Sequence, residues 1–266
     1  DETTVKMSKE IEKNVEGLDK TKKQNDQDDK KAKDDIDQCE PGDKKDGDGD
    51  DTPMYLLNRD GTVQEIKSDG TLGPPITKTG SDGINEILQP NGKVWRGDGA
   101  GAFPGKPFDA NATVDSRKLQ PGETSDLMHA TQLARYARQD YKGGNYASAS
   151  YVGADGKEII LVGHSGGPHS ERSIAYPVLA AGKKDNVQAM YTERAPCNGA
   201  SHYCEKWLAK HFDSDLDVTH SARYDQNESD KTRNAEHRRY REQLQEWHKA
   251  NGPTEFPNPD VKPKQK

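Results

Sequence analysis

The second half of the chain carries two hydrophobic periods that alternate along the sequence. Short apolar runs with the length of buried strands occupy 157–162, 187–192 and 216–220. Between them, apolar residues recur with helical spacing after residue 170 and again over 204–212, although Pro177 should bend or end the first helix. The order strand, helix, strand, helix, strand predicts right-handed crossovers, parallel pairing and a three-layer α/β/α sheet with ligands at the strand ends.

Further elements extend this unit on both sides. A cap signal at 124–126 precedes an amphipathic helix over 127–141, and a hairpin arm over 147–152 leads into the first of the strands above. The last helix, over 230–250, carries three apolar residues that should face the sheet: Tyr240, Leu244 and Trp247. We therefore expect an α/β domain over residues 124–266.

Residues 52–123 combine short apolar runs with turn signals. Runs at 54–57 and 63–66 flank Asn58-Arg59-Asp60-Gly61, a sequence that predicts a β-hairpin. No catalytic constellation is evident in this segment. We interpret it as a small β-rich spacer of unknown role.

Residues 1–51 are polar and charged, with 11 basic and 18 acidic side chains and no aromatic residue. This composition predicts a disordered leader and linker, or a solvated helix over 5–36. The leader alone accounts for the net charge of −7 of the whole chain. Cys39 stands alone in this segment, and we expect a free thiol without a role.

Four residues of the α/β domain have the types and the order needed to activate a water molecule on zinc. His169, Cys197 and Cys204 would bind Zn²⁺ through one imidazole and two thiolates, which leaves one position of a tetrahedral site open. Glu171 begins the same helix as the histidine, so it could take the proton of the water and pass it to the base nitrogen and the departing amine. The pattern predicts a zinc-dependent deaminase.

The order His169-Ser170-Glu171, then 191–197, then Cys204 is similar to the cytidine-deaminase-like superfamily. Over roughly residues 124 to 250, it resembles more narrowly the nucleic-acid deaminase domains that end bacterial polymorphic toxins. The resemblance implies hydrolysis of a C–N bond in a nucleobase, with cytosine in DNA or RNA as the expected substrate. It also implies an antibacterial toxin that is secreted or delivered into the cytoplasm of a target cell, and an immunity protein that covers the mouth of the active site.

The cysteine spacing leaves alternatives open. The usual second ligand pair of the family is Cys-x-x-Cys, whereas six residues, 198–203, separate the two cysteines here. If Cys204 is not a ligand, His202 is the nearest substitute. Cys197 and Cys204 could also close a disulfide loop, with His169 as an ordinary surface histidine.

A competing motif occupies the turn before the histidine. Gly163-His164-Ser165-Gly166-Gly167 matches the nucleophile elbow of α/β-hydrolases, which would make Ser165 the nucleophile of an esterase. Such a fold still needs a later acid and a later histidine, for which the candidates are Asp215, Asp217, His220 and His237. The chain before the turn lacks the apolar strands that should build a hydrolase sheet.

The nucleic acid expected as substrate would meet a region that is near neutral, with 20 basic and 19 acidic residues from Thr124 onward. A local basic patch on the last helix, and aromatic residues near the site, could contact a strand or stack on a base. The basic patch comprises Arg233, Arg238, Arg239 and Arg241 with Tyr240, and the aromatic candidates are Tyr191, Tyr203 and Trp207.

Two other functions fit the same residues. One is a deaminase of free nucleosides or nucleotides, although such an enzyme has no need of the charged leader. The other is a non-catalytic binding module with a structural zinc, which would need a fourth protein ligand that the sequence does not provide. No apolar span of membrane length and no lipidation motif is present, so we expect no membrane insertion.

Overall fold

The computed structural model describes residues 51–78, 83–97, 103, 108–109, 111–199 and 202–262. The predicted leader, the helix over 5–36 and Cys39 lie outside these residues. The chain from Thr52 onward forms one compact unit. No helix in the described ranges is both long enough and apolar enough to span a membrane.

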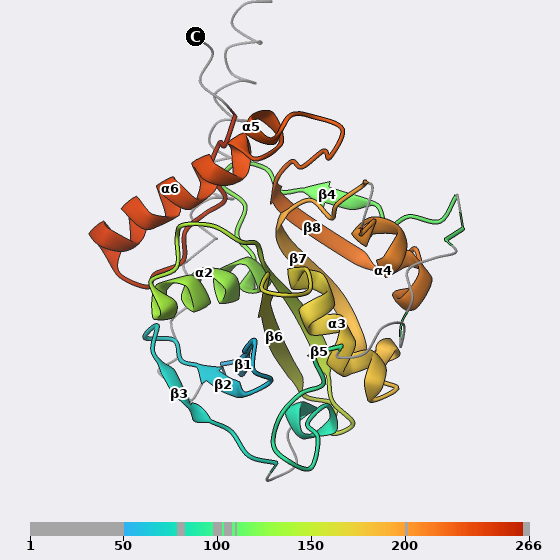
Figure 1. Cartoon of the computed structure of the whole chain (residues 1–266). Coiled ribbons are helices and arrows are strands. Elements are labelled where there is room, and N and C mark those ends of the chain that lie inside the picture. Colours follow the sequence, from blue (N-terminus) through green and yellow to red (C-terminus); the bar gives the residue numbers. More distant parts are fainter. Residues whose placement is uncertain are drawn as a thin grey trace, which may run out of the picture. The chain divides into compact units, whose positions relative to one another are not determined.

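One eight-stranded sheet organises the described residues, in the order β3-β2-β1-β6-β5-β7-β8-β4 (Figure 1). The strands are β1 (Met54–Leu57), β2 (Val63–Ile66), β3 (Leu72–Pro75), β4 (Ser116–Lys118), β5 (Tyr146–Val152), β6 (Glu158–His164), β7 (Val187–Arg194) and β8 (Asp217–Ala222). The α-helices are α2 (Asp126–Arg138), α3 (Ser170–Ala180), α4 (Cys204–Phe212), α5 (Asp230–Arg233) and α6 (Ala235–Asn251), with short 3₁₀ turns η1 (Gly83–Glu86) and η2 (Lys184–Asn186).

The three strands predicted from the apolar runs are β6, β7 and β8. β7 and β8 pair in parallel, as predicted, with Met190 opposite Val218. β6 and β7 are not neighbours, because β5 lies between them and pairs antiparallel with both. The short turn at 153–157 folds β6 back against β5 as an antiparallel neighbour. The connection from β6 to β7 through α3 therefore passes across β5.

The structure corrects the prediction of a separate β-rich spacer over 52–123. The hairpin of β1 and β2 forms as predicted, with Met54 opposite Ile66, but β1 also pairs in parallel with β6. β4 closes the opposite edge of the sheet by pairing with β8. The segment therefore supplies four of the eight strands rather than an independent unit.

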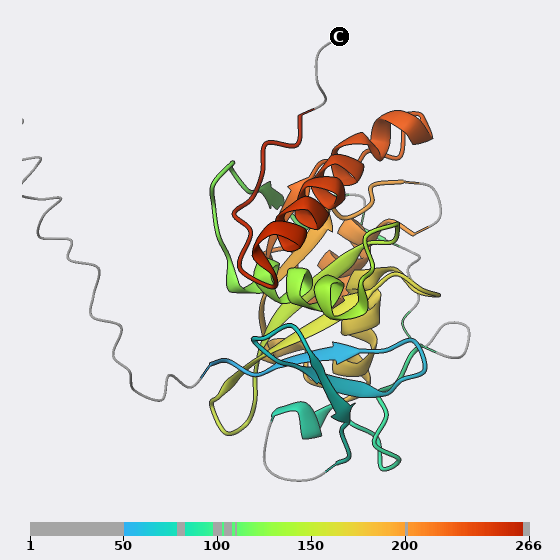
Figure 2. The same cartoon turned by 90° about the vertical axis from the view of Figure 1, so that its left-hand side faces the viewer.

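The central strands of the sheet are buried on both faces, which explains why side chains in β1 and β6 are apolar in succession. In β1, Leu57 belongs to the core beneath α3 and α4, whereas Leu56 packs beneath α2 on the other face. In β6, Leu161 and Val162 divide between the two faces in the same way. Figures 1 and 2 show the resulting three layers, with α3 and α4 on one face and α2 and α6 on the other. The predicted α/β/α architecture is confirmed.

Two helices differ from their predicted form. α3 continues through Pro177, and the Ser173 carbonyl, which has no proline N–H to bond, accepts a hydrogen bond from Nη1 of Arg96 at 3.4 Å. The last helix is divided at Asn234 into α5 and α6. Trp247 of α6 stacks on Phe256 of the C-terminal segment instead of packing against the sheet.

Candidate metal centre and catalytic pocket

The imidazole of His169 is placed where β6 meets α3. β6 ends at His164, and after the short loop Ser165 to Pro168 the backbone of His169 is extended, with φ −61° and ψ 155°. Its carbonyl accepts a hydrogen bond from the Ser173 backbone N–H at 2.9 Å, so His169 is the N-cap residue of α3. As predicted from the sequence, the histidine stands at a helix N-terminus.

The two cysteines meet between β7 and α4. Cys197 follows the end of β7, and Cys204 is the first residue of α4. Tyr203, at φ 43° and ψ 54°, turns the chain back, so the Cys204 backbone N–H donates a hydrogen bond to Sγ of Cys197 at 3.2 Å. Both thiols are buried and free, which corrects the alternative of a disulfide loop.

His169, Cys197 and Cys204 form a cluster that could hold a metal ion. Their candidate ligand atoms all lie within 4.8 Å of one another. Nδ1 of His169 is 3.2 Å from Sγ of Cys204 and 3.6 Å from Sγ of Cys197. The six-residue separation of the cysteines therefore does not prevent the second sulfur from reaching the first.

Hydrogen bonding within the cluster lowers the pKa of one thiol and raises the pKa of the other. The Cys204 thiol donates to Cys197 and, with help from His169, lowers the pKa of Cys197 to about 4. The same bond, together with burial, raises the pKa of Cys204 well above its ordinary value. The bond to Cys197 also raises the pKa of His169. A bound cation would favour both thiolates and a neutral imidazole, so the cluster should release protons when it takes up a metal.

Glu171 lies in the first turn of α3 and is 3% exposed. Its Oε2 accepts a hydrogen bond from the Ser170 hydroxyl at 3.0 Å, and its Oε1 accepts one from the Thr192 hydroxyl at 3.4 Å. Burial raises the pKa of the Glu171 carboxyl, and the nearby Cys197 adds to the increase. A raised pKa is the direction expected of a carboxyl that takes up and releases a proton during a reaction.

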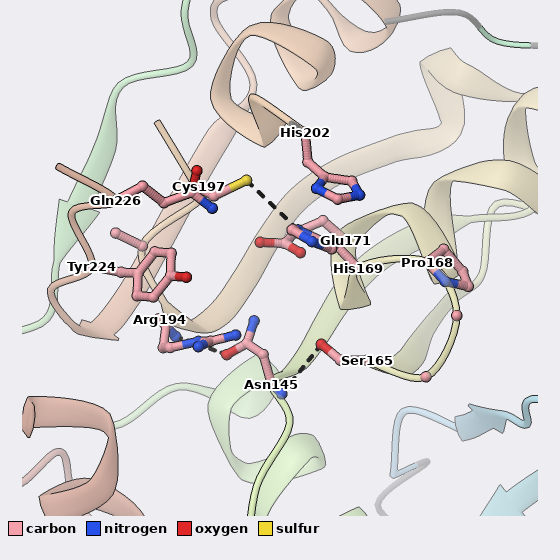
Figure 3. A pocket seen from close by; sticks show the side chains of 13 residues that line it. Asn145, Ser165, Pro168, His169, Glu171, Arg194, Cys197, His202, Tyr224 and Gln226 are labelled. Atoms are coloured by element: carbon pink, nitrogen blue, oxygen red, sulfur yellow. Dashed lines mark hydrogen bonds between the residues drawn. The ribbon is translucent and has the colours of Figure 1, made fainter. Parts of the chain in front are cut away.

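A cavity of about 340 Å³ opens onto the cluster. It is lined by Asn145, the loop Ser165 to Pro168, His169, Glu171, Arg194, Ala195, Cys197, His202, Tyr224 and Gln226. Figure 3 shows Glu171 at the centre of this pocket, between Cys197 and Pro168. The candidate metal cluster and the buried carboxyl of Glu171 thus share one cavity.

His202 has a different position from the one expected of a substitute ligand. Its ring stacks on His169 at 4.1 Å between centroids and an interplanar angle of 27°, and it lies outside the ligand cluster, which includes Cys204. Nη2 of Arg172 donates a hydrogen bond to the His202 carbonyl. His202 therefore covers one face of the His169 imidazole and forms part of the cavity wall.

Asn145 is a site residue that sequence reasoning missed. Its Nδ2 donates hydrogen bonds to the hydroxyls of Ser170 and Thr192, both at 2.7 Å, and these are the hydroxyls that donate to Glu171. Because each hydroxyl accepts from Asn145, its own proton is left for the carboxylate. Asn145 therefore orients Glu171 through two intermediates. The residue precedes a strand and matches no motif, so no signal in the sequence identified it.

Three of the four aromatic candidates from the sequence are buried, whereas the four arginines of the predicted basic patch are exposed or half-buried. Tyr191 is buried, with its hydroxyl bonded to Ser221 at 2.7 Å, and Trp207 is buried with Nε1 donating to the Phe103 carbonyl. Tyr240 is also buried, so the arginines of α6 do not surround an exposed aromatic ring. The aromatic side chains that line the cavity are instead Tyr224 and His202, which were not proposed for stacking.

Ser165 lacks the partners of a catalytic serine. Its Oγ accepts a hydrogen bond from the Asn145 backbone N–H at 3.3 Å, while the candidate histidines His220 and His237 bond to Ser116 and Glu193. The glycine that opens the motif has a packing role, since a Cβ on Gly163 would lie 2.9 Å from the Ser170 carbonyl oxygen. The first glycine of the Gly-x-Ser-x-Gly pattern therefore reflects close packing of α3 on β6.

Replacing Ser165 with alanine should change the deaminase activity by less than about threefold, because the side chain makes only one weak hydrogen bond in the described structure. The measurement is the initial rate of base conversion by the variant and by the wild type. A loss of all hydrolytic activity would revive the esterase alternative.

The structure has the arrangement that the sequence predicted for a deaminase. It combines a three-layer α/β/α sheet with a possible metal site and a buried carboxyl at one helix terminus. Residues 142–243 match the family model of the Xanthomonas-like deaminases. The matched segment includes all four predicted site residues and supports a deaminase family, whose members are hydrolases of C–N bonds. Searches of curated proteins and of solved structures gave no match. Strands β1 to β4 and helix α2 precede the matched segment.

Proposed function

We propose that the chain is a zinc-dependent deaminase that converts cytosine in DNA or RNA to uracil. The observation that carries this proposal is the convergence of one imidazole, two thiols and one buried carboxyl on a single cavity. The match to a deaminase family over residues 142–243 supports it independently.

The donor set fits zinc. One histidine and two cysteines are a frequent ligand set of catalytic zinc, which keeps a fourth position for water or substrate. Among the described residues the cluster contains no fourth ligand, and two of its members, His169 and Cys197, line the cavity. A structural site would be closed by a fourth side chain, so the arrangement favours a catalytic centre over a binding module.

The reaction exchanges the amino group of the base for the oxygen of water and releases ammonia. Zinc held by His169, Cys197 and Cys204 would supply Lewis-acid activation of that water. Glu171 would accept one proton from the water and give it to the ring nitrogen of the base. It would then take the second proton from the oxygen newly bonded to the ring carbon and give it to the amine, which departs as ammonia. The raised pKa of its carboxyl suits it to carry the proton between these steps.

The cavity walls favour a planar ring. Tyr224 and His202 bring aromatic rings to the cavity lining, which also includes Ala195. A base in a duplex is not accessible to such a pocket, so the target must be single-stranded or flipped out of its stack.

The biological role that we propose follows the resemblance to toxin domains. The chain would be the toxic part of a bacterial polymorphic toxin that is delivered into a competing cell, and an immunity protein would cover the cavity mouth in the producer. A bacterium that expresses the wild-type chain in its cytoplasm should stop growing, and one that expresses the Glu171→Ala variant should grow.

Base conversion by the purified chain tests the proposed activity. Single- and double-stranded DNA and RNA are incubated with the zinc-loaded protein and sequenced, with the Glu171→Ala variant as the control. We expect cytosine-to-uracil changes above the control in at least one polymer. Conversion equal to the control on every polymer, together with release of ammonia from cytidine or its nucleotides, would instead indicate a salvage enzyme.

A further inference from the structure

An arginine from outside the matched deaminase segment borders the cavity. A Cβ added to Gly166, which lines the cavity, would lie 2.7 Å from both Nε and Nη2 of Arg59. The guanidinium of Arg59 therefore rests directly against the glycine loop that forms one wall. A side chain at Gly166 would displace it, so glycine allows the cation to approach the mouth.

The sheet topology explains why Arg59 is at this place. Arg59 lies in the turn after β1, and β1 runs parallel to β6, with Leu56 opposite Val162. The carboxyl ends of parallel strands lie at the same edge of a sheet, so the turn after β1 lies beside the loop after β6. That loop is the segment from Ser165 to Pro168.

Arg59 is exposed and forms no ion pair with any described residue. The acidic residue next to it, Asp60, is engaged within the turn, where its Oδ1 accepts hydrogen bonds from the backbone N–H and the hydroxyl of Thr62. Asp60 therefore does not neutralise the Arg59 guanidinium, whose N–H donors can bind an anionic group outside the turn.

A second arginine borders the cavity on the other side. Arg194 stacks on the ring of Tyr224 at 4.5 Å and donates a hydrogen bond from Nη1 to Asn234 at 2.9 Å. Both of these partners are neutral, and no ion pair involves Arg194 within the described ranges. Figure 3 shows Arg194 and Tyr224 on one side of Glu171, and Ser165 and Pro168 on the other.

A neighbouring cavity is lined by acidic side chains rather than by lysine or arginine. It shares Ala195 and Tyr224 with the catalytic cavity and has a volume of about 510 Å³, but Asp115 and Glu205 line it. Two carboxylates repel a phosphate group, so this cavity is a poor phosphate site. Arg194 is the only lysine or arginine among the described residues that line either cavity, and Arg59 lies against the lining at Gly166.

We propose that Arg59 and Arg194 bind the phosphates on the two sides of the target nucleotide, and that the β1–β2 hairpin is thereby part of the substrate site. This inference rests on the proposed function and deepens it, because two phosphate contacts require a polynucleotide strand rather than a free nucleoside. The contacts carry no base information, since they position the strand over the pocket.

Salt-dependent binding tests the role of Arg59 without relying on turnover. The Glu171→Ala protein is titrated with short single-stranded DNA and RNA oligonucleotides that contain one cytosine, over a range of salt concentrations. Adding Arg59→Ala should weaken the binding of the preferred strand about two- to fivefold at low salt. It should also reduce the slope of log K against log salt by about 0.7, the value for one phosphate contact on a single strand.

Two matched variants control this experiment. Arg59→Lys keeps the charge and should preserve most of the salt slope, although it loses the bidentate geometry. Lys67→Ala also removes one positive charge, but just after the carboxyl end of β2, away from the turn that carries Arg59. This variant should leave affinity and slope unchanged. Equal affinity and slope with and without Arg59, or an equal loss in Lys67→Ala, would overturn the proposal. Failure of the wild-type chain to convert any base would disprove the proposed activity, whereas these binding curves would still decide the role of Arg59.

Discussion

Replacing Glu171 with alanine should lower kcat for base conversion by about two to four orders of magnitude while zinc content stays unchanged. The carboxyl is buried in the cavity and does not belong to the ligand cluster. Its removal should therefore take away the proposed proton carrier without removing a proposed metal ligand. The measurements are single-turnover rates on the preferred polymer and the zinc-to-protein ratio after dialysis.

Glu171→Gln is the matched control for this variant. Glutamine keeps the shape of the side chain and can still bond to the Ser170 and Thr192 hydroxyls, but it cannot carry a proton. We expect a loss as large as that of the alanine variant. A rate within about tenfold of the wild type, or a variant that no longer binds zinc, would contradict the role assigned to Glu171.

Replacing Glu193 with alanine should lower the free energy of unfolding by about 3–5 kcal/mol, the usual cost of breaking a buried ion pair. Glu193 of β7 and Arg135 of α2 are both fully buried, and two hydrogen bonds of 2.5 and 2.6 Å join them. Oε2 of Glu193 also accepts hydrogen bonds from the Tyr146 backbone N–H and from His237. The variant would leave the Arg135 charge uncompensated between α2 and the sheet. Urea unfolding at neutral pH measures the loss.

The double variant Arg135→Met with Glu193→Ala measures how much of the stability depends on the interaction between the two side chains. It leaves no buried charge, so its loss of stability should be clearly smaller than the sum of the two single losses. Additive losses would show that the two side chains do not depend on each other.

The pH dependence of the wild type provides a further check on the Glu193 pair. Although burial opposes ionisation, Arg135 lowers the pKa of Glu193 from 4.5 to about 2. The stabilisation by the pair should therefore be complete above pH 4.5 and be lost as the pH falls towards 2. The difference in stability between the wild type and Glu193→Ala should shrink over the same interval.

Local patterns were sufficient to predict the elements that carry the site. The apolar runs and helical spacings predicted β6, β7, β8, α3 and α4, and the turn signals predicted the β1–β2 hairpin. The order of His169, Glu171, Cys197 and Cys204 on these elements was enough to expect that they meet, because strand ends of one α/β unit converge.

Long-range pairing limited the rest of the prediction. Nothing in the sequence near β1 indicates that it pairs with β6, about a hundred residues later, so the hairpin was interpreted as a spacer. Asn145 and the pair of Arg135 and Glu193 are polar residues whose importance depends on partners brought together by folding. Tyr191 and Trp207 lie near the site in sequence but belong to the core. Tyr191 packs with Leu119 and Met128, and Trp207 packs in the core beneath α3 and α4.

X-ray absorption at the zinc edge tests the central claim most directly, since it reports the atoms around the metal in the purified chain. We predict two sulfur ligands at about 2.3 Å and two nitrogen or oxygen ligands at about 2.0–2.1 Å, from the two cysteines, the histidine and one exchangeable water. Cys204→Ser should remove one sulfur from this shell. A protein that binds no zinc with both thiols reduced, or a shell closed by four protein ligands, would contradict the account.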